Sequence, residues 1–89
     1  MSLTIRLAEA RDQGRCLELL NLLMGVSDSK HETFDAKTFS ELISNTRGSL
    51  VVVEEGSDLL GMASISFNLA LRYNGEYCQL EELVVDPRA

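Results

Sequence analysis

The sequence predicts an α/β protein of the α+β kind, with elements in the order β-α-α-β-β-β and a mainly antiparallel sheet. Three observations lead to this prediction. Apolar residues recur with helical spacing in two segments of the first half of the chain, whereas the second half carries runs rich in β-branched residues. An Asn-Gly pair at residues 74–75 then separates the last two runs, and Asn-Gly between apolar runs is a strong hairpin signal.

The first half of the chain predicts one short strand and two helices. Residues 4–7 form a β-like run. From residue 13 the apolar residues follow the i, i+3, i+4, i+7 spacing, which predicts a helix over residues 13–24 with Asp12 as N-cap and Gly25 as its end. Residues 26–33 are polar and predict a loop. Asp35 is a candidate cap for a second helix, which ends within residues 45–48. Its apolar side is formed by Ala36, Phe39, Leu42 and Ile43.

The second half predicts three strands. Residues 50–53 form the first, and residues 55–58 form a turn. Residues 59–69 form the second strand, and residues 77–86 return as the third. Strict alternation divides the second strand into two faces. The residues expected on one face are Leu59, Gly61, Ala63, Ile65 and Phe67, and those expected on the other are Leu60, Met62, Ser64 and Ser66.

Composition narrows the class of protein. The chain has 89 residues, long enough for one small domain with a thin core. Its net charge of −6 disfavours nonspecific binding to nucleic acid or to an anionic membrane surface, and tolerates a cationic substrate. We expect a cytoplasmic protein, since the N-terminus lacks the apolar run of a signal peptide and no apolar segment is long enough to span a membrane. Two distant cysteines and one histidine predict neither a disulfide framework nor a metal site.

Three segments, in order, carry a family resemblance. Residues 6–12 read Arg-Leu-Ala-Glu-Ala-Arg-Asp, residues 55–61 combine Glu-Gly with Leu-Gly, and residues 82–87 read Glu-Leu-Val-Val-Asp-Pro. They resemble the opening Arg-x-Ala-x-x-x-Asp, the second hairpin and the fourth strand of the GNAT superfamily of N-acetyltransferases. The resemblance implies that residues 1–89 form a partial GNAT (acyl-CoA N-acyltransferase) domain, its N-terminal half.

The resemblance also implies a chemistry: transfer of acetyl from acetyl-CoA to a primary amine, either a small amine or a peptide amine. The amine must lose a proton, and a glutamate on the fourth strand can accept it. Glu82 is the first candidate and Glu81 the second. Strand neighbours point to opposite faces, so only one faces the cleft unless a bulge intervenes. The alternative is that both are ordinary solvent-exposed strand residues.

Other site residues follow from the same resemblance. The backbone of Leu83, Val84 and Val85 would pair with the pantetheine arm of acetyl-CoA as a substitute strand. Their side chains are also ordinary core residues of a strand. His31 and Glu32, in the loop between the helices, would contact the substrate, although a lone histidine in a polar loop is more often simply exposed.

The family's phosphate-binding loop has no counterpart in the sequence. It requires consecutive backbone N–H groups at a helix N-terminus, whereas the six glycines are scattered and no residue follows Ala89. We therefore expect a truncated domain that is inactive as the isolated chain and self-associates through the edge of strand 77–85 or through a bare sheet face. The alternative is a non-catalytic α/β interaction or ligand-sensing module that dimerises through its terminal strand.

Overall fold

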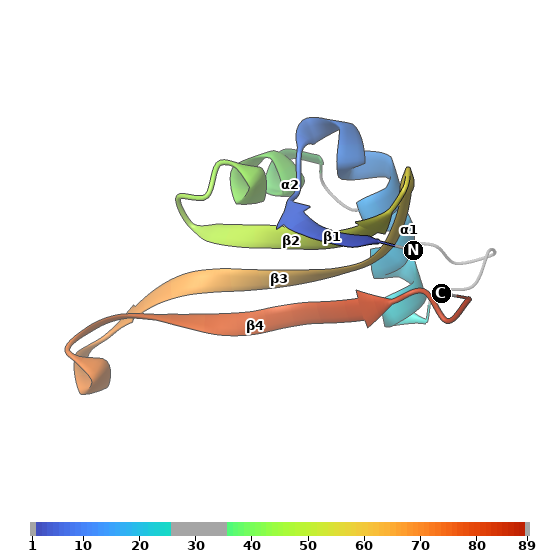
Figure 1. Ribbon diagram of the computed structural model, residues 1–89. Helices are drawn as coiled ribbons and strands as arrows, with labels where there is room; N and C mark the ends of the chain where they lie inside the picture. Colours follow the sequence, from blue (N-terminus) through green and yellow to red (C-terminus); the bar gives the residue numbers. More distant parts are fainter. Residues whose placement is uncertain (1, 26–35, 89) are drawn as a thin grey trace.

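The computed structural model describes residues 2–25 and 36–88 and confirms the predicted order of elements (Figure 1). The strands are β1 (Leu3–Leu7), β2 (Gly48–Glu55), β3 (Asp58–Ala70) and β4 (Gly75–Val85). The helices are α1 (Gln13–Met24) and α2 (Ala36–Ile43), with short 3-10 turns η1 (Ala10–Asp12) and η3 (Leu71–Tyr73). The predicted loop at residues 26–33 and the predicted cap Asp35 lie outside the described residues.

The four strands form one antiparallel sheet in the order β1-β2-β3-β4. Both helices pack on one face, called here the inner face (Figure 1). The β3–β4 hairpin is longer than its neighbour, because β2 pairs with β3 only as far as Ser66. The end of the hairpin therefore projects beyond the rest of the sheet.

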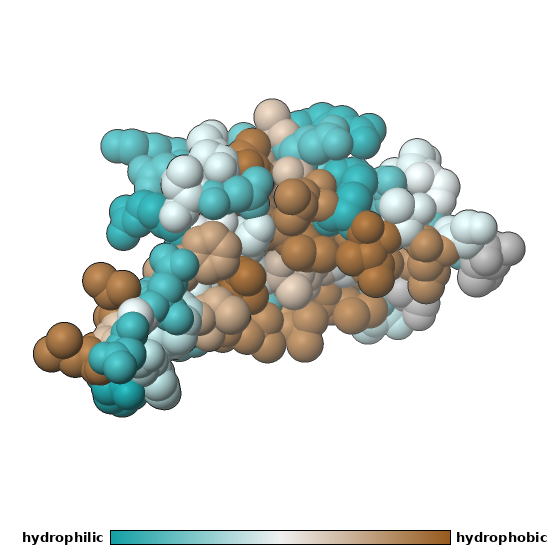
Figure 2. Space-filling view, turned by 60° about the vertical axis from the view of Figure 1, so that its left-hand side comes forward, coloured by the Kyte–Doolittle hydropathy of each residue, from teal (hydrophilic) through white to brown (hydrophobic). Residues whose placement is uncertain are grey.

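The opposite, outer face of the sheet is apolar and is not covered by any element of the described part of the chain. Figure 2 shows hydrophobic side chains gathered in a band over the strands. Six aliphatic side chains that the register places on this face are more than half exposed: Leu3, Ile5, Leu7, Leu80, Leu83 and Val85. The outer face is thus a candidate contact surface.

The core lies between the inner face and the two helices. Leu19 of α1 and Val52 of β2 are fully buried, and Phe39 of α2 packs into the same cluster. The thiol of Cys16 is also buried there, and burial raises its pKa to about 11. Cys78 is exposed, and both cysteines are free thiols. The helical period of the apolar residues thus predicts the burial of Cys16, Leu19 and Phe39, but not the exposure of Leu23 and Met24 at the end of α1.

The N-terminus of α1 differs from the prediction. Asp12 precedes the helix, but its side chain does not cap it. The carboxylate of Asp12 instead accepts the backbone N–H of Glu9 at 2.8 Å and closes the η1 turn before the helix. The C-terminus is as predicted: Gly25 adopts a left-handed conformation (φ +68°), which favours glycine, and its N–H donates to the carbonyl of Leu22.

A bulge in β3 overturns part of the predicted alternation. Val53 pairs with Gly61 and Glu54 with Leu59, so Leu60 is left without a partner. Leu59 therefore joins Met62 in the core on the inner face, and its predicted grouping with Gly61 is wrong. One extra residue shifts the side-chain period, and strict alternation along the sequence cannot anticipate the shift.

The predicted hairpin between β3 and β4 is confirmed, but its turn is longer than a two-residue loop. The 3-10 turn η3 comes first, and Asn74 follows in the left-handed region (φ +59°). Gly75 then adopts φ +151° and opens β4. Asparagine and glycine are the residues that tolerate positive φ, which explains why this pair marks the turn.

Candidate functional site

A second bulge lies in β4, at the two candidate glutamates. Ser64 pairs with Glu82 and Ile65 with Leu80, so Glu81 is the extra residue of β4. This bulge is the condition under which both carboxylates face the same side. The Ser64 hydroxyl bonds the Glu82 carboxylate, and the Ser66 hydroxyl donates to Oε2 of Glu81 at 2.6 Å. Because Ser64 and Ser66 are two residues apart on β3, the two carboxylates lie together on the inner face.

Neighbouring side chains hold the two glutamates in place. The Asn68 amide donates to Oγ of Ser66 at 2.9 Å, so Glu81, Ser66 and Asn68 form a continuous row across β3 and β4. Glu82 is partly buried, whereas Glu81 is exposed. Hydrogen bonds from neutral hydroxyls orient the carboxylates without neutralising them, and the charge stays available to a ligand.

Neither glutamate has a cationic partner among the described residues, whereas three other carboxylates do. Asp12 and Glu54 share Arg6, and Asp86 pairs with Arg15 and Arg88. A partly buried carboxylate without a cation leaves a charge that a cationic ligand can neutralise. The pair is therefore suited to binding an ammonium group.

A pocket of about 370 Å³ opens beside Glu82, between the helices and the inner face. Its walls are mostly apolar side chains of α1 and α2, with β2 and β3 at its floor. Glu82 is the one charged residue among the described residues that line it. The lining residues are Cys16, Leu17, Leu20, Met24, Thr38, Phe39, Leu42, Leu50, Met62, Ser64 and Glu82. Such a pocket is of the size that small-molecule sites have.

The backbone beyond the glutamates forms one edge of the sheet in the described structure. The N–H of Asp86 donates to the carbonyl of Leu60 in the direction of β3, at 2.8 Å. Alternate residues of a strand direct their backbone groups to opposite sides, so Val84 also faces β3, whereas Leu83 and Val85 face the free edge. Of the three residues predicted to bind a cofactor arm, Leu83 and Val85 present backbone groups there, and the side chain of Val84 packs in the core.

Two ion clusters hold the ends of the strands beside the site. Nη1 of Arg6 lies 2.8 Å from the Asp12 carboxylate, and its Nε lies 3.0 Å from Glu54. Hydrogen bonds from Arg6 hold the pKa of Asp12 and the pKa of Glu54 below their usual range. Ala8 is buried, and its N–H donates to the carbonyl of Leu50. The Arg-x-Ala-x-x-x-Asp spacing thus joins β1 to β2 and to the start of α1.

The second cluster lies at the end of β4. Asp86 is buried and accepts Nη2 of Arg15 at 2.7 Å and Nη2 of Arg88 at 2.8 Å. Hydrogen bonds from Arg88 and then Arg15 hold the pKa of Asp86 far below its usual range. These bonds tie the end of β4 to α1. Neither cluster is predicted from the sequence, although the segments that resemble the family contain Arg6, Asp12 and Asp86.

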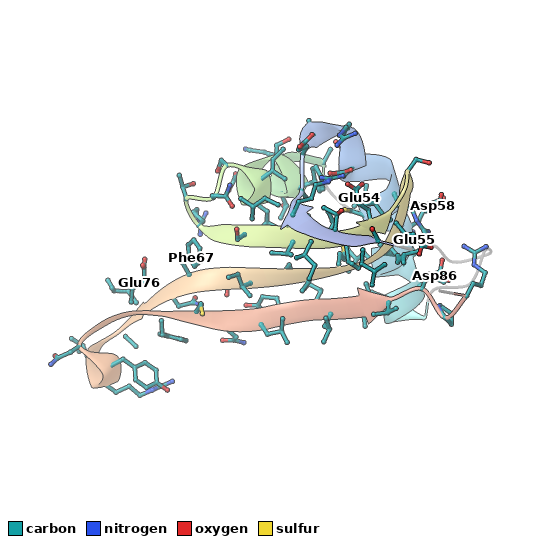
Figure 3. All side chains as sticks on the ribbon, viewed as in Figure 1. Glu54, Glu55, Asp58, Phe67, Glu76 and Asp86 are labelled. Carbon is teal, nitrogen blue, oxygen red and sulfur yellow. The ribbon has the colours of Figure 1, made fainter. Side chains whose placement is uncertain are left out.

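A larger hollow of about 460 Å³ lies at the same end of the sheet, over Leu59, Leu60 and Asp86. Figure 3 shows Glu54, Glu55, Asp58 and Asp86 toward this end of the sheet, and of these Asp58 and Asp86 line the hollow. Within residues 2–25 and 36–88, no group of histidine, cysteine or carboxylate side chains is arranged to hold a metal ion. Three of the charged residues that line this hollow, Arg15, Asp86 and Arg88, already pair with one another, so the pocket beside Glu82 is the better candidate site.

The remaining predicted site residues, His31 and Glu32, lie outside the described residues. No helix of the described structure is long and apolar enough to cross a membrane. Neither a protein-family model nor a curated protein sequence matches the chain. The class of protein is therefore inferred from solved structures of similar fold.

The fold is that of the N-terminal part of the GNAT N-acetyltransferases, as predicted. A transcriptional regulator from Bacillus halodurans C-125 matches with a TM-score of 0.79 and 21% identity, over 99% of this chain and 63% of that one. A glucosamine-6-phosphate N-acetyltransferase from Arabidopsis thaliana matches with a TM-score of 0.73 and 24% identity, over 99% and 63%.

A third structure, an aminoglycoside 6'-N-acetyltransferase from Acinetobacter baumannii, matches with a TM-score of 0.74 and 16% identity, over 98% of this chain and 59% of that one. The chain thus spans about three-fifths of the length of these proteins. At such low identity the similarity concerns the fold alone.

Proposed function

We propose that the protein is an N-acetyltransferase that transfers acetyl from acetyl-CoA to a primary amine. The observation that carries the proposal is the bulge at Glu81, which sets two carboxylates without cationic partners beside a pocket and next to a free strand edge. Acetyltransferases among the structural relatives support the same class of reaction. Two of these relatives differ in their acceptors, so the fold does not select the amine.

The chemistry assigns a role to each part of the site. Acetyl-CoA supplies an acetyl group activated as a thioester. Glu82 accepts a proton from the ammonium form of the substrate, which frees the nitrogen lone pair for attack on the thioester carbonyl. The new C–N bond replaces the C–S bond, the attacking nitrogen loses a second proton, and the thiolate of coenzyme A takes up a proton and leaves as the thiol. Glu81, bonded to Ser66 on the same face, is the second candidate for the base.

The free edge of β4 is the proposed binding site of the pantetheine arm. Backbone N–H and C=O groups of Leu83 and Val85 can pair with the two amides of the arm, as an added strand would. The described residues offer no corresponding site for the diphosphate of acetyl-CoA, because no glycine-rich run leading into a helix occurs in residues 2–25 or 36–88. The fit to acetyl-CoA is therefore partial.

The partial fit leads to a testable prediction. A polypeptide of these 89 residues should bind acetyl-CoA weakly, because backbone pairing at one edge lacks the contribution of a phosphate cradle. Titration calorimetry with acetyl-CoA and with pantetheine provides the measurement. Similar weak affinities for both ligands are expected, whereas tight binding that depends on the diphosphate would show that the chain holds a phosphate site.

A second candidate function is a non-catalytic interaction or ligand-sensing module. The observation that favours it is the apolar outer face, which offers a surface for another protein. An assay for release of coenzyme A separates the two functions. Protein expressed from the complete reading frame that contains residues 1–89 should release coenzyme A in the presence of a primary amine. Absence of release with a broad panel of amines would favour the module.

A further inference from the structure

The pocket beside Glu82 is lined mostly by apolar side chains and has a single charged residue in its wall. Helix α1 contributes three apolar side chains one turn apart, and α2 contributes two more from the opposite side. These are Leu17, Leu20, Met24, Phe39 and Leu42. Met62 continues the apolar surface onto β3. A ligand inside the pocket would therefore contact hydrocarbon on several sides.

The charge of the pocket lies at one place. Glu82 extends from β4, and the Ser64 hydroxyl bonds its carboxylate from β3. No arginine or lysine of the described chain pairs with that carboxylate, and none lines the pocket. A carboxylate at the wall of an apolar pocket complements an ammonium group attached to an apolar body. The same carboxylate disfavours anions, which would leave it unpaired. The apolar lining disfavours neutral polyols, which would bring polar groups against hydrocarbon.

The volume limits the size of the ligand. A pocket of about 370 Å³ holds roughly a dozen non-hydrogen atoms, at the ~30 Å³ that a water molecule occupies in the liquid. This capacity suits one short alkyl or aryl group with its amine. A large polar molecule such as an oligosaccharide would have to remain mostly outside.

We propose that the acceptor is a small primary amine with an apolar body, bound with its ammonium group at Glu82 and Ser64 and its body between α1 and α2. The assignment of this ligand as acceptor rests on the proposed acetyl transfer. The binding itself does not depend on acetyl-CoA, so it can be tested separately.

Three probes of equal length test the proposal by NMR titration of the 89-residue chain. Hexylamine has both the ammonium and the apolar body, 1-hexanol lacks the charge, and 2-(2-aminoethoxy)ethanol lacks the apolar body. Each methylene buried in an apolar site strengthens binding about four-fold. We expect hexylamine to bind at least about ten-fold more tightly than either of the other probes, with shift changes at Leu20, Phe39 and Glu82.

Two variants locate the interaction. Glu82→Gln keeps the shape of the side chain and removes its charge, so it should abolish the preference for hexylamine over 1-hexanol. Glu76→Gln removes a charge from an exposed residue at the start of β4, on the projecting hairpin away from the pocket (Figure 3), and should leave the preference intact. The comparison of the three probes on the unaltered chain keeps the test valid even if a variant does not fold.

Three results would overturn the proposal: equal binding of hexylamine and the ether amine, equal binding of hexylamine and hexanol, or shift changes confined to the outer face of the sheet. The acetyl transfer assay reports on the proposed function independently. Transfer to polar amines without any preference for hexylamine would reject the apolar acceptor alone. A hexylamine preference in a protein that never transfers acetyl would reject the enzyme alone.

Discussion

Two groups of carboxylates in this protein differ in whether they pair with a cation: one holds the fold, and the other is the pair that we propose binds a ligand. Asp12 and Asp86 are buried acids bonded to arginines. Glu81 and Glu82 are bonded to neutral serine hydroxyls only. The sequence motifs contain both groups without distinguishing them, because a motif does not show which partner each carboxylate meets.

Asp12 provides a test of the structural group. The pKa of its carboxyl is lowered in the folded protein, so its contribution to stability is present above the unfolded pKa of ~3.9 and is lost as pH falls through the lower folded pKa. Asp12→Asn should lower the free energy of unfolding by about 2 kcal/mol at pH 7. The difference from the unaltered protein should shrink towards pH 2.

Urea denaturation at several pH values measures the effect of Asp12→Asn. Glu41→Gln is the matched control, because its ion pair with Arg47 is exposed and spans 3.7 Å. The control should change stability by less than about 0.5 kcal/mol. If Asp12→Asn lowered the free energy of unfolding by the same amount at every pH from 7 to 2, the result would contradict the role of the Asp12 charge.

At the scale of elements, the bulge in β4 determines how the site is built. Because Glu81 is the extra residue, its deletion should restore a regular ladder in which Leu80 still meets Ile65 and Glu82 still meets Ser64. We expect the deletion to lower the melting temperature by no more than about 5 °C, which corresponds to roughly 1 kcal/mol in a domain of this size.

Deletion of Leu83 is the matched comparison. It removes a residue from a regular part of β4, so it would turn Val84 out of the core or displace Glu82 from Ser64. Circular dichroism during heating measures both deletions. Loss of cooperative unfolding is expected for the Leu83 deletion only. Equal damage from both deletions would show that Glu81 is not a bulge residue.

The elements also show what the sequence can and cannot predict. The spacing of Cys16, Leu19, Leu20 and Leu23 predicts α1 with its observed bounds, because an amphipathic helix has that period, although Leu23 itself is exposed. The bulges at Leu60 and Glu81 could not be located, since each inserts one residue without a characteristic side chain. The bulge at Glu81 matters most, because alternation alone would place the two glutamates on opposite faces.

For the whole molecule, the outer face of the sheet predicts association. Six more than half-exposed aliphatic side chains, at roughly 100 Å² each, approach the ≈ 800 Å² per partner of a standard interface. We expect the 89-residue chain to self-associate at micromolar concentration, through the outer face or through the free edge of β4. Sedimentation velocity measures the state directly, and a compact monomer at these concentrations would contradict the prediction.

Two variants distinguish the surfaces. Ile5→Lys places a charge on the outer face at β1, at the opposite edge of the sheet from β4. Leu83→Lys charges both the outer face and the edge of β4. Association through the face should be lost in both variants, whereas association through the edge should be lost in Leu83→Lys alone.

The pH dependence of acetyl transfer tests the central claim, that Glu82 accepts the proton of the amine, most directly. The measurement uses hexylamine and protein expressed from the complete reading frame that contains residues 1–89, with Glu82→Gln and Glu76→Gln compared to the unaltered protein. We predict that Glu82→Gln lowers kcat about 100-fold or more near pH 7, where the amine is protonated, and that the defect narrows as pH approaches ~10. Glu76→Gln should match the unaltered protein. A Glu82→Gln protein with an unchanged rate at every pH would contradict the account.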